Sequence, residues 1–111
     1  MTQDVTSARR VVLEGPLTLR SVEAVRATLQ AAFEQQTDIA IDCAAADEID
    51  LSFIQVLIAA RASAVRLGGT VGLVAPPGAA LLDTMTRAGF RAVAESPIGD
   101  TEVFWIDGDP L

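Results

Sequence analysis

Residues 39–74 form the part of the chain that most limits how it can fold. The apolar run 39–42 (IAID) is followed by an acidic segment at 47–50, by an apolar-rich segment of helical spacing at 53–67, and by a second apolar run at 71–74. Gly68 and Gly69 separate the helical segment from the second apolar run. This order predicts a strand, an acidic loop, a helix that begins beside Ser52, and another strand.

The same alternation is predicted on both sides of this segment. Residues 10–13 are expected to form a strand followed by a turn at Gly15-Pro16, and residues 21–33 place apolar side chains at helical spacing. Pro76 and Pro77 are expected to open a third helix that runs to residue 88, with Gly89 as its C-terminal cap. The alternation predicts an α/β fold with a mostly parallel sheet of four or five strands and helices packed against it.

The C-terminal segment, residues 93–111, leaves two interpretations open. Residues 96–100 (SPIGD) are typical of a loop, whereas residues 103–106 (VFWI) suit either a final strand or a helix that packs back on the domain. A chain of 111 residues is long enough for one hydrophobic core and too short for two. We therefore expect a single domain over residues 1–111 with its core at about 8–92.

The charged residues exclude several classes of function. Fifteen acidic residues against eight basic ones give a net charge of −7, which repels the phosphate backbone of nucleic acids. All eight basic residues are arginines, and the chain has no lysine and no histidine. It therefore lacks the lysine of a P-loop, a histidine general base and histidine metal ligands. We expect no catalytic residue, no cofactor and no nucleic-acid partner.

The single cysteine and the hydropathy of the chain bear on its disulfide content and its location in the cell. Cys43 is the single cysteine, so no intrachain disulfide is possible, and its place directly after an apolar strand predicts a packed thiol. No apolar run approaches the roughly 20 residues that cross a bilayer, and the first residues have no signal-peptide pattern. We expect a cytoplasmic protein without direct membrane insertion.

The segment from 39 to 74 resembles the STAS domain family, the domain of bacterial anti-sigma factor antagonists. The order and spacing of several short motifs carry the resemblance: Asp42 closing a strand, Ile49-Asp50 before Ser52, Leu57 with Ala59-Ala60-Arg61 inside the helix, and Gly68-Gly69 before the next strand. Gly15, after the apolar run 11–13, fits the exit from the first strand of the family. The resemblance covers residues 8–92 and implies a STAS-like fold.

Ser52 has two interpretations. Ser52 and Gln55 have the spacing of a capping box, in which the serine hydroxyl caps the helix and stabilises it by about 1 kcal/mol. The resemblance implies instead that the residue aligned with Ser52 is phosphorylated by a partner anti-sigma factor with kinase activity. A phosphate would add roughly 1.5 to 2 negative charges at the helix N-terminus, which the helix dipole tolerates and a docked partner would not.

The resemblance also implies where a partner binds, namely the N-terminal half of the central helix. The family has small residues around the serine, whereas Leu51 and Phe53 flank Ser52 here. Their bulk would either hinder a kinase or supply an apolar anchor for a different partner. The second case describes an accessory subunit of a lipid-transport ABC ATPase, or of a chemotaxis or signalling complex, without a phosphoswitch. The expected partner-binding residues are Asp50, Leu51, Ser52, Phe53, Gln55 and Ala59.

The helical wheel predicts a water-facing side of mostly small residues, which suits a docking protein, although alanines are also simply good helix formers. Its members are Ser52, Gln55, Ala59, Ala62, Ser63 and Arg66. Arg61 falls among apolar residues and is expected to lay its stem along them.

The acidic residues 42, 47, 48 and 50 are oxygen donors on one segment, but they lack the regular alternation and the glycine of a calcium loop. We therefore assign no metal site to them.

Overall fold

A five-stranded sheet runs through the molecule. In the computed structural model, which describes residues 9–108, β1 (Arg9–Val12), β3 (Asp38–Asp42) and β5 (Thr70–Val74) lie next to one another in that order. These three strands are parallel, with Ile39 opposite Arg9 on one side and Val71 on the other. Parallel neighbours require crossover connections, and the two predicted helices supply them.

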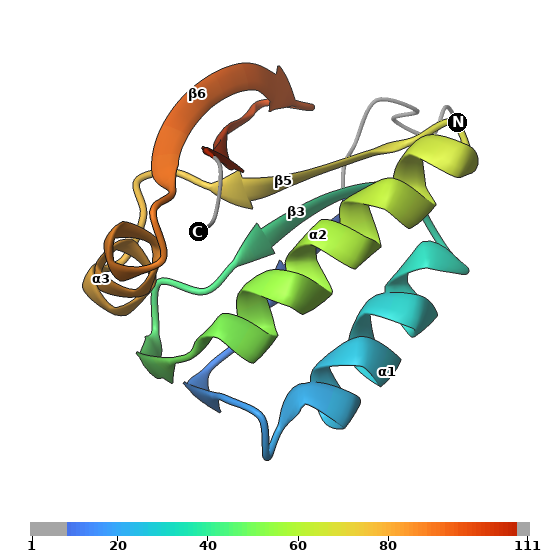
Figure 1. The fold of residues 1–111 in the computed structure, drawn as a ribbon. Helices are drawn as coiled ribbons and strands as arrows, with labels where there is room; N and C mark the ends of the chain where they lie inside the picture. The colour runs from blue at the N-terminus through green and yellow to red at the C-terminus, as the bar shows by residue number, and fades with distance from the viewer. Residues whose placement is uncertain (1–8, 109–111) are drawn as a thin grey trace.

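The crossover helices α1 (Val22–Phe33) and α2 (Leu51–Arg66) lie side by side on the same face of the sheet, as Figure 1 shows. Alternate strand residues such as Ile41 and Leu73 point toward them and are fully buried. Alternation with period two on the strands and 3.6 on the helices places apolar side chains of both in one layer. This layer contains most of the hydrophobic core.

Helix α3 (Ala79–Arg87) lies at one end of the sheet and leads into β6 (Figure 1). It buries Leu81 and Met85. The helix begins two residues after the predicted proline pair, and its C-cap residue is followed by Gly89 with φ of +90°. The predicted glycine cap is therefore confirmed, since this left-handed conformation favours a residue without Cβ.

A second, two-stranded sheet was not predicted. β2 (Gly15–Leu17) pairs in parallel with β4 (Ala46–Ile49), where the sequence predicts a turn and an acidic loop. The pairing is favourable because Leu17 and Ile49 are both buried in the main core, while Asp47 and Glu48 remain exposed. The prediction of loop structure was wrong because these strands are too short to show a clear alternating pattern.

The C-terminal residues form a hairpin that extends the sheet. β6 (Arg91–Ile98) and β7 (Thr101–Asp107) are antiparallel, and β7 pairs with β5 at Leu73 and Val74. Of the two alternatives for 103–106, the strand is confirmed. The predicted loop at 96–100 is wrong over most of its length, because β6 continues to Ile98 and the turn is limited to Gly99 and Asp100. The β6 sequence is short of large apolar residues, so pairing with β7 rather than local pattern makes it a strand.

The sheet order is β1-β3-β5-β7-β6. The predicted α/β fold, with a mostly parallel sheet and helices packed against it, is confirmed. Across residues 9–108, no helix combines the length and the apolar character needed to cross a membrane.

Candidate functional site

The N-terminus of α2 is capped by Asp50. Its Oδ1 accepts a hydrogen bond from the backbone N–H of Ser52 at 2.9 Å, and its Oδ2 accepts one from the backbone N–H of Leu19 at 3.0 Å. The backbone N–H of Asp50 donates to the carbonyl of Leu17 in the small sheet. The predicted capping box of Ser52 and Gln55 is therefore wrong, because the chain enters the helix two residues earlier and aspartate is as good a cap as serine.

Ser52 is consequently the second residue of the helix and is free of a capping role. Its side chain is partly exposed, and its hydroxyl makes no hydrogen bond to any atom of residues 9–108. It lies in a small hollow of about 170 Å³ between the helices, lined by Leu19, Val22, Arg26, Ser52, Gln55, Val56 and Ala59. A hydroxyl in this position is available for modification or for contact with a partner.

Of the expected partner-binding residues, Asp50 is partly buried and serves as the cap of α2, and the residues that follow it divide into two groups. Leu51 is 47% exposed, Gln55 and Ala59 are also exposed, and all three lie within about 100° of Ser52 on the helical wheel. Phe53 is only 1% exposed and packs in the core, so the expectation of an exposed phenylalanine beside Ser52 is wrong. It points to the sheet because it lies on the opposite side of the helix from Gln55 and Ala59.

Leu19 completes this surface and was missed by the sequence analysis. It is 69% exposed in the turn before α1 and lines the same hollow as Ser52. The one signal in the sequence is a leucine between two polar residues, after the predicted turn at Gly15-Pro16, which does not distinguish a functional residue from an ordinary surface one. We call the set Leu19, Leu51, Ser52, Gln55 and Ala59 the α2 docking surface.

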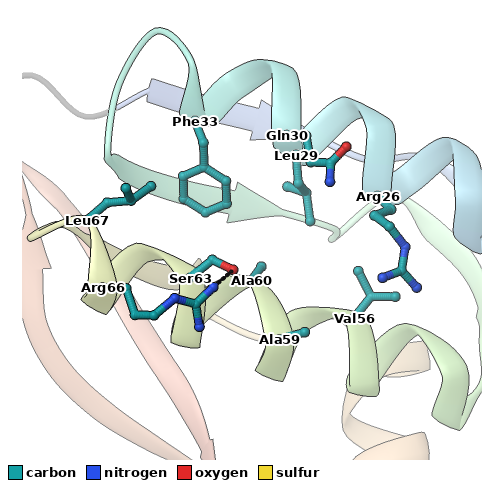
Figure 2. Close-up of a pocket in the computed structure, with 10 residues that line it drawn as sticks. All are labelled: Arg26, Leu29, Gln30, Phe33, Val56, Ala59, Ala60, Ser63, Arg66 and Leu67. Carbon is teal, nitrogen blue, oxygen red and sulfur yellow. Dashed lines mark hydrogen bonds between the residues drawn. The ribbon is translucent and has the colours of Figure 1, made fainter.

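A groove between α1 and α2 continues from this surface. Figure 2 shows its residues, with Phe33, Leu29 and Val56 extending toward the space between the helices and Arg26 and Arg66 at opposite ends. The groove has a volume of about 330 Å³, and it shares Arg26, Val56 and Ala59 with the hollow around Ser52. Arg66 donates a hydrogen bond to the hydroxyl of Ser63 at 3.2 Å. The predicted water-facing side of the helix thus forms one wall of an open groove.

The acidic residues 42, 47, 48 and 50 do not come together as a group of metal ligands. Asp42 forms an ion pair with Arg10 and accepts a hydrogen bond from the backbone N–H of Ala44. Those two hydrogen bonds, with the Ala44 amide the stronger cause, lower the pKa of the Asp42 carboxyl below its ordinary value. In the part of the chain that the structure describes, no three acidic or cysteine side chains come together as metal ligands.

Cys43 follows Asp42 and is buried, as expected for a packed thiol. Burial is the main cause that raises its pKa to about 11, and the neighbouring Asp42 charge adds to it. The thiol is therefore protonated at neutral pH and unsuited to nucleophilic chemistry.

Arg61 links α2 to the C-terminal hairpin. Its two guanidinium nitrogens donate to the two carboxylate oxygens of Glu95 at 3.0 and 2.9 Å, and the guanidinium carbon lies 4.5 Å from the centre of the Trp105 ring. This arrangement combines a bidentate ion pair with a cation–π contact. Arg61 therefore has a structural role, and it is outside the α2 docking surface.

Comparison with known proteins gives a family and no individual relative. No curated protein and no solved structure matches the chain. A family model described as Mlab, STAS domain, matches residues 1–95. This match covers most of the chain, including both crossover helices and the site around Ser52. The chain belongs to the STAS domain family.

Proposed function

We propose that this protein is a non-enzymatic regulatory module that binds a protein partner through the α2 docking surface. STAS domains generally mediate protein–protein interactions. The observation that carries the proposal is the combination of an uncommitted Ser52 hydroxyl with the exposed side chains of Leu19 and Leu51 next to it. Exposed leucines beside a hollow lined by mostly small side chains of α2 are what a docking protein would cover.

The partner that we propose first is an anti-sigma factor with kinase activity, which would phosphorylate Ser52. In that step the Ser52 oxygen bonds to the γ-phosphorus of ATP, the bond to the departing ADP breaks, and the hydroxyl proton is released. Because Asp50 caps the helix, Ser52 can be modified without loss of the cap. The fold would therefore tolerate the phosphate.

The surroundings of Ser52 suit a switch of binding rather than of folding. The phosphate would lie at the N-terminus of α2, where backbone N–H groups and the helix dipole favour an anion. Arg26 lines the same hollow and is engaged by Glu23 only at 3.9 Å, so it would offer a counter-charge. A partner seated over Leu51 and Ser52 would face a bulky dianion and would be released.

A second candidate is a constitutive accessory subunit, either of a lipid-transport ABC ATPase or of a chemotaxis or signalling complex. The exposure of Leu51 favours it, since this leucine directly precedes Ser52 and gives the surface an apolar anchor. In this case Ser52 contributes its small size and its hydroxyl to a permanent interface, and it is not modified.

Quantitative binding with three variants tests the proposal. The tagged protein is used to capture partners from its own cells, and the affinity of the purified partner is then measured for wild type, Ser52→Asp, Leu51→Ala and Ser63→Asp. Ser63 is on the same helix but outside the docking surface, so Ser63→Asp controls for added charge. A phosphoswitch requires strong weakening by Ser52→Asp and the appearance of phosphoserine 52 when the partner is incubated with ATP.

The constitutive subunit predicts a different pattern. Leu51→Ala should weaken binding, and no phosphoserine should form with ATP. Equal affinity of Ser52→Asp, Leu51→Ala and wild type would show that the partner uses another surface and would contradict both candidates.

A further inference from the structure

The outer edge of β6 is open. β6 is the last strand of the sheet, and Figure 1 shows it arching along the outside of the molecule. Within residues 9–108, its backbone hydrogen bonds go to β7 on the inner side, and none joins its outer side to another element. Residues 91–97 are all exposed. An edge of this kind can pair with a further strand.

The side chains of β6 match in charge and size when two copies of the strand run antiparallel to each other. Residues 91–95 read Arg-Ala-Val-Ala-Glu. If two copies of β6 pair antiparallel with Val93 opposite Val93 of the second copy, each Arg91 lies opposite Glu95 of the other copy. Ala92 then lies opposite Ala94, so small residues meet small residues. A shift of one residue in either direction would set Arg91 against Ala94 or Ser96 and remove both charge pairs, so one register is favoured.

The ion pairs that Arg91 and Glu95 form within each copy extend this complementarity. Arg91 pairs with Asp107 at 3.1 Å, and Glu95 pairs with Arg61 at 2.9 Å. In the paired arrangement, charges of alternating sign form a row across the contact. The row consists of Asp107 and Arg91 of one copy, followed by Glu95 and Arg61 of the second copy. A guanidinium has five N–H donors and a carboxylate about four acceptor sites, so the new ion pairs form without loss of the existing ones.

Apolar side chains beside the edge would be covered in the same contact. Val93 is 40% exposed at the centre of the strand. Val65 of α2 is 66% exposed and lines a hollow together with Ala94 and Glu95. These side chains add apolar contact to the backbone hydrogen bonds of a strand pair.

We propose that β6 is a self-association surface, on which a second copy of this chain pairs antiparallel about a two-fold axis at Val93. The contact is isologous, because the same five residues serve in both copies, and it therefore closes after two subunits. It joins two five-stranded sheets edge to edge. The inference is independent of the proposed function, since it uses none of the residues of the α2 docking surface.

Sedimentation equilibrium of the full chain tests the proposal, together with a matched pair of variants. Val93→Asp places two like charges at the two-fold axis and should raise the dimer dissociation constant by about tenfold or more. Val12→Asp is the control, because Val12 is a similarly exposed valine on β1, the opposite edge strand of the sheet. It should leave the dimer intact. A wild type that stays monomeric at all concentrations, or dissociation by Val12→Asp rather than Val93→Asp, would overturn the proposal.

Charge exchange gives a test that does not depend on Val93. Arg91→Glu and Glu95→Arg each place like charges opposite one another in a homodimer, so each variant alone should be monomeric. In an equimolar mixture the two strands are complementary again, and a heterodimer should form. Circular dichroism of each variant establishes that it is folded. Failure of two folded variants to associate on mixing would contradict this register.

Discussion

The carboxylate of Asp50 lies 2.9 Å from the backbone nitrogen of Ser52 and leaves the Ser52 hydroxyl without a structural task. The same carboxylate accepts a hydrogen bond from the backbone N–H of Leu19. One side chain therefore fixes both the start of α2 and the turn that precedes α1. The two exposed leucines of the α2 docking surface therefore owe their positions to a residue that is itself half-buried.

We expect Asp50→Ala to lower the free energy of unfolding by about 1 to 2 kcal/mol, because it removes the N-cap of α2. Ser52→Ala should change it by less than about 0.5 kcal/mol, since the hydroxyl is unbonded and alanine is a good helix former. Urea denaturation of both variants gives the comparison. A larger loss in Ser52→Ala than in Asp50→Ala would show that the serine is the cap after all.

Arg61→Leu should destabilise the packing of the hairpin on α2 by about 1 kcal/mol, because it removes the bidentate ion pair with Glu95 and the contact with the Trp105 ring. Trp105 is the single tryptophan of the chain, so its fluorescence reports the contact directly. Arg61→Lys serves as the control that keeps the charge but not the planar fork. Unchanged fluorescence and stability in Arg61→Leu would contradict a structural role.

Two glycine substitutions should differ in severity for a steric reason. A Cβ at Gly72 would lie 2.9 Å from Cβ of Val103 and 3.1 Å from Cδ1 of Ile98, so Gly72→Ala should cost about 1 to 3 kcal/mol as the hairpin shifts. A Cβ at Gly69 would overlap the backbone carbonyl of Thr37, which cannot rotate away. Gly69→Ala should therefore cost more than Gly72→Ala. Thermal unfolding of the two variants tests this order, and the reverse order would contradict it.

The ion pair of Asp42 predicts a dependence of stability on pH. Because the amide of Ala44 and the guanidinium of Arg10 lower the pKa of Asp42 in the folded state, its contribution is present above the ordinary aspartate pKa of 3.8. It is lost as the pH falls below 3.8 through the folded-state pKa. Asp42→Asn should thus be less stable than wild type at neutral pH, and the gap should close in acid. Urea denaturation at a series of pH values measures it, and a gap that persists at the lowest pH would argue against this cause.

The central crossover, which runs from β3 through α2 to β5, could be predicted because it depends on the pattern of apolar residues along one short segment. The runs 39–42 and 71–74 are continuous apolar segments with glycines between helix and strand, and their burial on a parallel sheet follows from that composition. The site was less predictable. Asp50 and Ser52 are both common N-cap residues, and which of them caps the helix depends on where β4 ends and how it pairs with β2.

The sequence by itself determined the alternation of strands and helices, the exclusion of lysine and histidine chemistry, and the family motifs around Ser52, because each depends on residue type and spacing along the chain. Only the tertiary structure decided that Phe53 is buried while Leu51 is exposed, that Leu19 joins Ser52 in one hollow, and that β6 ends the sheet with an open edge. These features depend on the rotation of a helix against the sheet and on contacts between distant segments, which local pattern does not encode.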